Sequence, residues 1–347
     1  MGHWPGRMRG VCLLLAAAVT ASLPGELSAF VGQIAESADP PSPALPRPFP
    51  GSSEPQPAGP PPSPAVWDMG VYEGLGAWVD VHDYGNSDSM APDVLLDELR
   101  RRGVRTLYLQ TGRWTSAADM AHAEAAGALV ERAHARNLEV VGWYLAGFAD
   151  IDMDLRRSLA VLDFRTSGGE RFDGFGADIE ERGATRGDRE RFNRGVVEYS
   201  RRLRESVPVG TALGAIVPDA KNNERAPAHW SGFPWPEIAR YYDVVIPMAY
   251  WSVTKRPRTC RSVEMDARGY IREVIDKTQG LMGTTKPMHP VGGIADCDTT
   301  REVRGYVDGL HEKATLGGGL YDFLTTNDHP ARESFWTELG RVNRAGS

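Results

Sequence analysis

The sequence predicts an α/β fold, a (β/α)8 TIM barrel, in residues 70–347. Three observations support it: β-rich runs alternate with helical segments, the runs are apolar on both faces, and there are eight of them. Strands of that kind belong to parallel sheets covered by helices, and eight units fit a barrel of about 250 residues. An open doubly wound sheet is the alternative, but no G-x-G-x-x-G follows the first run.

The predicted strands are short and rich in β-branched and aromatic residues. In chain order they are residues 76–84, 104–112, 138–148, 172–180, 209–218, 242–251, 288–294 and 317–325.

Helical patterns fill the segments between these strands. Residues 91–103 begin with a proline and acidic residues and end with arginines and glycine, which is the polarity of a helix. The same reasoning predicts helices in residues 116–137, 187–206, 263–280, 299–314 and 329–344.

The chain before the barrel has two parts. Residues 1–29 follow a signal-peptide pattern: an uncharged stretch follows two arginines, and Ala21 and Ala29 are candidate cleavage positions. The apolar stretch is short for a membrane span, so we expect a secreted or cell-envelope protein, with an uncleaved anchor as the alternative. Residues 30–69 hold 12 of the 25 prolines and predict a disordered linker.

Charge and cysteine content limit the partners. The formal net charge of −7 argues against a nucleic-acid partner. Removal of the signal peptide leaves Cys260 and Cys297, which we expect to form a disulfide outside the cell. We expect a monomer without a cofactor. Asp80, His82 and Asp83 could hold a metal ion, but no H-x-x-x-H or C-x-x-C spacing predicts one.

Polar and aromatic side chains gather where the predicted strands end. Active sites of these barrels lie at the C-terminal ends of the strands. Aromatic rings there suit the apolar faces of sugars, and Gln110, Arg113 and Asn327 could bind hydroxyl groups. The candidate substrate-binding residues are Asp80, Trp114, Trp143, Trp251, Tyr321 and Asp322.

The fourth strand ends in a pair of acids. Asp178 and Glu180 are two residues apart in a strand, so their side chains face the same side. Neighbouring carboxylates repel, so one of them holds its proton more tightly. An acid beside a charged carboxylate is the arrangement that cleaves glycosidic bonds. A structural cluster with the nearby arginines is the alternative.

Two motifs resemble those of family 18 glycoside hydrolases, the chitinase-like barrels. D-G-F-G-A-D-I-E, from Asp173 to Glu180, resembles their strand-4 signature D-x-x-D-x-D-x-E. M-A-Y, ending at Tyr250, resembles the first three positions of their M-x-Y-D motif. The resemblance implies that Glu180 is the general acid, that Asp178 and Tyr250 hold an acetamido group of the substrate, and that Asp173 is structural.

The chain departs from that family at three positions. Gly176 replaces the middle Asp, Trp251 replaces the last Asp of M-x-Y-D, and Tyr321 replaces a tryptophan at the end of strand 8. These departures favour a carbohydrate-binding barrel without catalysis as one alternative; retention of both acids argues against it. Family 25 lysozymes, which are loosely similar in a D-x-E pair and a strand-1 acid, are another. A structural envelope protein is the third.

Overall fold

The computed structural model describes residues 68–254 and 265–344. Eight parallel strands close into a barrel in chain order, and the eighth pairs with the first. This confirms the predicted (β/α)8 fold. The strands are β1 (Gly74–Val79), β2 (Thr106–Arg113), β3 (Glu139–Leu145), β4 (Gly174–Asp178), β5 (Gly214–Pro218), β6 (Val244–Ala249), β7 (Val291–Ile294) and β8 (Gly317–Tyr321).

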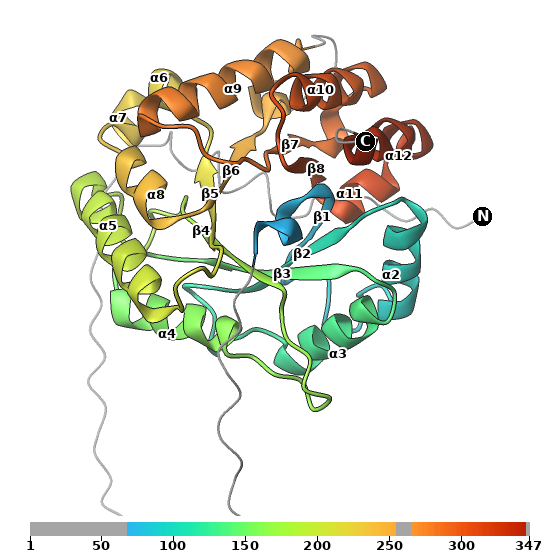
Figure 1. Cartoon of the computed structure of the whole chain (residues 1–347), viewed down its shortest axis with the longest axis horizontal. Helices are drawn as coiled ribbons and strands as arrows, with labels where there is room; N and C mark the ends of the chain where they lie inside the picture. Colours follow the sequence, from blue (N-terminus) through green and yellow to red (C-terminus); the bar gives the residue numbers. More distant parts are fainter. Residues whose placement is uncertain (1–67, 255–264, 345–347) are drawn as a thin grey trace, which may run out of the picture. The chain divides into compact units, whose positions relative to one another are not determined.

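Helices surround the barrel (Figure 1). Their ends follow the expected chemistry: α2 has proline in its first turn, and Thr299 and Glu302 form a capping box at the start of α10. The main helices are α2 (Pro92–Arg101), α3 (Ala123–His134), α4 (Ile151–Leu162), α5 (Arg189–Ser206), α8 (Trp235–Tyr241), α9 (Ala267–Met282), α10 (Thr300–Glu312), α11 (Phe323–Asp328) and α12 (Arg332–Leu339).

Alternation along each strand produces two apolar cores. On β4, Phe175 and Ala177 pack in the layer between the strands and the helices. On β3, Val141, Trp143 and Leu145 pack in the second core, inside the barrel. Side chains two apart on a strand share a face. Gly174, Gly176 and Asp178 therefore face the barrel interior, and the acid lies at its C-terminal end.

Several predicted boundaries are wrong. β1 ends at Val79 rather than at residue 84, β5 begins at Gly214 rather than at 209, and α4 was not predicted. The eighth strand ends at Tyr321 rather than 325; the next peptide bond is cis, and α11 follows with Asp322 as its N-cap.

The helix predicted in residues 116–137, α3, begins at Ala123 rather than near residue 116. In that loop the Arg157 guanidinium donates to the carbonyl groups of Arg113, Trp114 and Ser116, so these carbonyls have partners without a helix.

The predicted signal peptide and nearly all of the predicted linker precede the described residues, and Cys260 lies in the internal gap. The disulfide with Cys297 therefore stays a prediction. Within residues 68–254 and 265–344, no helix is long and apolar enough to cross a membrane.

Asp173, which begins the strand-4 motif, ties three segments together. Its Oδ2 accepts from the backbone N–H of Val140, 2.7 Å away, and lies 2.9 Å from Nε2 of His134. Nδ1 of His134 lies 2.7 Å from Glu170 Oε2. The role of Asp173 is structural, as the motif implied.

This cluster predicts a pH-dependent stability. The bonds to Asp173 and Glu170 raise the pKa of His134 to about 9, so its contribution is full below about pH 6.5. It is lost as the pH rises through 9. We expect His134→Gln to lower the unfolding free energy at pH 6 and to have a smaller effect at pH 10, measured by urea denaturation. His82→Gln, at an exposed site, is the control; an equal loss at both pH values would contradict the prediction.

Candidate active site

Most of the predicted site residues meet at one end of the barrel. We call the C-terminal ends of the strands and the loops after them the rim. Asp178 ends β4, Tyr321 ends β8, and Asp80, Tyr250 and Asp322 each follow directly on a strand. Electrostatic interactions join Tyr321 to Asp80, Asp322, Tyr250 and Glu180, and join Tyr250 to Asp178, Glu180 and Asp322. The expectation that these residues cluster is confirmed.

Asp178 is a buried acid, and one of its carboxylate oxygens lacks a hydrogen bond to the described residues. Its side chain is 4% exposed, and the oxygen without a hydrogen bond is Oδ1. Burial, with smaller contributions from Glu180 and Glu181, raises the pKa of Asp178 well above its usual value, while Arg113 opposes the shift. A buried polar atom without a hydrogen bond lowers the stability of the fold. A ligand that forms a hydrogen bond with Oδ1 of Asp178 would remove this penalty.

Glu180 lies next to it and is partly buried. Burial raises the pKa of Glu180 to about 7; the charge of Glu181 adds to the shift and that of Arg113 opposes it. A carboxyl group with that pKa carries a proton for part of the time at neutral pH. General acids work best when their pKa lies near the operating pH.

The position of the missing family Asp is occupied by apolar groups. A Cβ at Gly176 would lie 3.1 Å from Ile216 Cδ1 and 3.3 Å from Trp143 Cβ. Both side chains belong to the core inside the barrel. Below Asp178 the barrel interior therefore holds apolar side chains of β3 and β5 near Gly176, where the family motif has a carboxyl group.

Two of the three predicted tryptophans are core residues. Trp251 is fully buried in the core between the strands and the helices, with its ring centroid 5.1 Å from that of Tyr306 on α10. Its prediction as a substrate-binding residue is wrong. Trp143 is 4% exposed and lies edge-on to Trp78 inside the barrel, with ring centroids 6.0 Å apart. It forms a wall of the interior rather than an open platform for sugars.

Trp114 remains a candidate for sugar stacking. It is partly buried in the loop after β2. A Cβ at Gly183 would lie 3.5 Å from its Cζ2 atom, so the ring lies beside the loop that follows Glu180.

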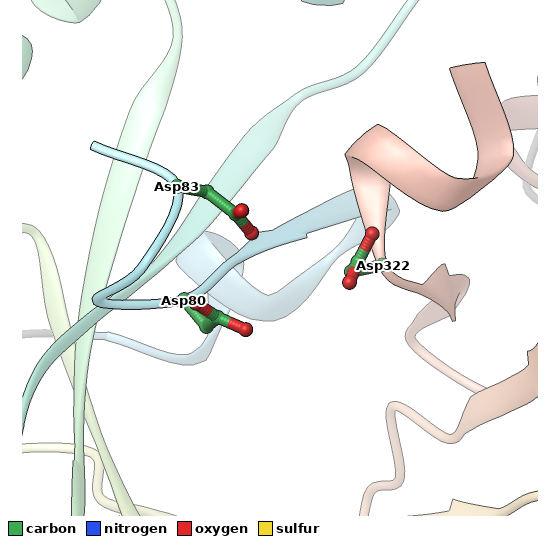
Figure 2. A group of neighbouring side chains, drawn as sticks. All are labelled: Asp80, Asp83 and Asp322. Carbon is green, nitrogen blue, oxygen red and sulfur yellow. The ribbon is translucent and has the colours of Figure 1, made fainter. Parts of the chain in front are cut away.

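Three further acids form a second group on the rim. Carboxylate oxygens of Asp80, Asp83 and Asp322, one from each residue, all lie within 4.8 Å of one another. Figure 2 shows the three side chains turned toward a common space. Asp80 Oδ1 also accepts from His82 N at 2.7 Å, and Asp322 Oδ1 from Thr325 N at 2.7 Å. We call these three residues the aspartate triad; carboxylates of this kind can hold a cation such as Ca²⁺.

Sequence analysis did not predict two influences on the acid pair or the grouping of Asp80 and Asp83 with Asp322. Arg113 and Glu181 act electrostatically on both Asp178 and Glu180, although only Arg113 had been considered, as a sugar-binding residue. Asp80 and Asp83 lie close to Asp322, which directly follows β8, while His82 is exposed. Gln110 is structural, because its Oε1 accepts from the N–H of Val81 at 3.1 Å.

Fold and site together define a closed parallel barrel with buried carboxyl groups and tyrosines at its strand ends, and solved structures share that fold. A chitinase from Bacteroides thetaiotaomicron is 10% identical, with a TM-score of 0.57 over 79% of this chain and 97% of that one. An endo-1,4-beta-mannanase from Rhizomucor miehei is 10% identical, with a TM-score of 0.56 over 78% and 94%. A family GH18 chitinase from Cycas revoluta is 14% identical, with a TM-score of 0.53 over 77% and 99%.

At these identities the likeness is one of fold. No protein-family model matches the sequence, and no curated protein sequence matches it.

Proposed function

We propose that this protein is a glycoside hydrolase with Glu180 as its general acid. The observation that carries the proposal is the pKa of about 7 for Glu180 at a barrel strand end, beside buried Asp178, one of whose carboxylate oxygens lacks a hydrogen bond to the described residues. Barrel enzymes place their catalytic groups at these ends. The proteins named in the titles of the similar folds, two chitinases and a mannanase, support a glycan as the substrate class.

In this mechanism protonated Glu180 gives its proton to the glycosidic oxygen as the bond to the anomeric carbon breaks. Burial raises the pKa of Tyr250 well above its usual value, so its phenol stays protonated and can donate to the sugar. Asp178 forms a hydrogen bond with the substituent on the carbon next to the anomeric carbon. The negatively charged carboxylates of the rim stabilise the developing oxocarbenium ion. Water then adds to the anomeric carbon and gives a proton back to the Glu180 carboxylate, which completes hydrolysis.

A panel of glycans tests the proposal. The full-length chain is incubated with chitin, chitosan, peptidoglycan, mannan and cellulose, beside a variant carrying Asp178→Asn and Glu180→Gln, and the release of reducing ends is measured. We expect release from at least one glycan by the wild type alone. Peptidoglycan cleavage would favour the lysozyme-like alternative.

A binding barrel without catalysis is the second candidate. The apolar surroundings of Gly176 favour it, because the Cβ of an Asp there would contact Ile216 and Trp143 at only 3.1 and 3.3 Å. Binding of a glycan without cleavage by either protein would establish this function instead.

We also propose that the protein acts outside the cytoplasm after removal of residues 1–29, with a bridge between Cys260 and Cys297. The signal-peptide pattern and the even number of remaining cysteines support this. N-terminal sequencing of the mature protein and a thiol titration test it; an intact N-terminus in the cytoplasm would contradict it.

A further inference from the structure

The register of β2 shifts just before the strand reaches the rim. Gln110 pairs with Trp143 of β3, whereas Gly112 pairs with Tyr144, the next residue of β3. Thr111 is therefore an extra residue, as in a β-bulge. Such bulges change the face to which the following side chains point, and they are often found beside active sites.

The bulge turns Arg113 toward the acid pair, Asp178 and Glu180. Arg113 pairs with Leu145 of β3, and Leu145 pairs with Asp178 of β4, so the three residues lie at one level of the barrel. Leu145 belongs to the core inside the barrel, and residues that pair in register face the same side of a sheet. Simple alternation from Tyr108, which lies in the same core, would instead turn Arg113 toward the helices.

The electrostatic interactions agree with this direction. Arg113 opposes the rise in the pKa of both Asp178 and Glu180. Its Nε atom is buried and has no hydrogen bond among the described residues. The position of the guanidinium therefore depends on the backbone that carries it.

Arg157 of α4 holds that backbone. Its side chain is 6% exposed. Nη1 donates to the carbonyl oxygens of Arg113 and Trp114 at 2.9 and 2.8 Å, and Nη2 donates to that of Ser116 at 2.5 Å. The planar guanidinium offers several donors in one rigid fork, so a single side chain fixes three carbonyl groups directly after the bulge.

The loop after β2 also packs against its neighbours on the rim. A Cβ at Gly147, in the loop after β3, would lie 2.8 Å from Cβ of Trp114 and 2.9 Å from Cβ of Ala184, in the loop after β4. Gly147 thus contacts both loops and leaves no room for a side chain. The loop that Arg157 fixes is therefore in register with the segment that follows Glu180.

We propose that Arg157 is a positioning residue of the active site: it holds the bulged end of β2 so that the guanidinium of Arg113 lies beside the acid pair. The catalytic consequence rests on the proposed function and deepens it. The charges that act on Glu180 are those of Glu181 and Arg113. Loss of Arg157 should therefore affect the acid through Arg113.

Titration of Glu180 tests the proposal without requiring catalysis. The full-length chain is labelled with ¹³C at the glutamate carboxyl groups, and the signal of Glu180 is assigned by its loss in Glu180→Gln. We expect a pKa of about 7 in the wild type and a higher value in both Arg113→Gln and Arg157→Gln, since Arg113 lowers this pKa. The double variant should titrate like Arg113→Gln alone. Arg156→Gln is the control, because Arg156 is the exposed neighbour on α4 and bonds to Asp119; it should titrate like the wild type.

The rate profile gives the second measurement. The basic limb for glycan hydrolysis should move to higher pH in Arg157→Gln by as much as in Arg113→Gln. A role in stability alone would lower the amount of folded enzyme and leave the limb in place. If Arg157→Gln does not fold, Arg157→Lys replaces it, because lysine keeps the charge but lacks the planar fork; the pKa of Glu180 should again be higher than in the wild type.

Two results would overturn the proposal. A wild-type titration of Glu180 in a folded Arg157 variant would show that Arg157 does not position Arg113. A further rise in the double variant, beyond that in Arg113→Gln, would show that Arg157 acts by another route. If Glu180 titrates as expected but no glycan in the panel above is cleaved, only the proposed function fails; if a glycan is cleaved and the titration does not move, only this inference fails.

Discussion

Replacement of Glu180 by Gln is expected to lower kcat for glycan hydrolysis by roughly 10²–10⁴-fold, the contribution typical of a general acid. Glutamine keeps the size of the side chain but has no acidic proton to give to the leaving oxygen. KM should change less, since Asp178 and Tyr250, which would hold the substrate, remain. The measurement is reducing-end release under saturating substrate. The matched control is Glu190→Gln, an exposed glutamate at the start of α5, which should keep wild-type activity.

The pH dependence makes this prediction specific. Glu180 must be protonated to act, and its pKa is about 7, so wild-type activity should fall as the pH rises through 7. Glu181 raises this pKa and Arg113 lowers it. Glu181→Gln should therefore move the basic limb of the rate profile to lower pH, and Arg113→Gln should move it to higher pH. A limb that stays in place in both variants would show that another group controls it.

The barrel and much of its rim could be predicted because both follow from local patterns. Alternation of apolar runs and helices gave eight strands near their observed positions. In a closed parallel barrel all strand ends meet at one rim, so Asp178, Glu180, Tyr250 and Asp322 could be grouped although up to 144 residues separate them in the sequence. The pairing of Asp83 with Asp322 required the contact between the loop after β1 and the end of β8, which closure of the barrel provides.

The roles of the tryptophans were harder to predict, because the sequence does not show how deeply a side chain is buried below the rim. Trp251 and Tyr250 are adjacent, and only one of two adjacent strand residues can face the interior. If Tyr250 of the predicted strand faces the site, its neighbour Trp251 must face the helices. The sequence therefore contained the information needed to exclude Trp251 from the site. Trp143 does face the interior, but its depth below the rim depends on the residues stacked above it. That stacking is a property of the packed barrel and not of the strand alone.

The tight packing around Gly176 predicts a large loss of stability when a side chain is added at this position. Gly176→Asp, which restores the family acid, is expected to destabilise the fold by about 2–6 kcal/mol. Its Cβ would press on Ile216 and Trp143 at 3.1 and 3.3 Å, and overpacking of this kind costs about 1–3 kcal/mol. The new carboxyl group would also lie among apolar side chains beside Asp178, where an unpaired polar group costs about 1–3 kcal/mol more. Urea denaturation measures the loss.

Substitution of Trp143 tests whether tight packing causes the loss of stability in Gly176→Asp. Trp143→Ala alone should cost about 3–5 kcal/mol through the cavity it leaves. Combined with Gly176→Asp, the total loss should be smaller than the sum of the two, since the added carboxyl group occupies part of that cavity; such coupling between contacting residues is typically about 0.5–3 kcal/mol. Gly280→Asp on α9, where a Cβ has no neighbour within 4 Å, is the control and should change stability little. A Gly176→Asp variant as stable as the wild type would mean that the site can accept the family acid, and that its absence reflects a different substrate group rather than lack of space.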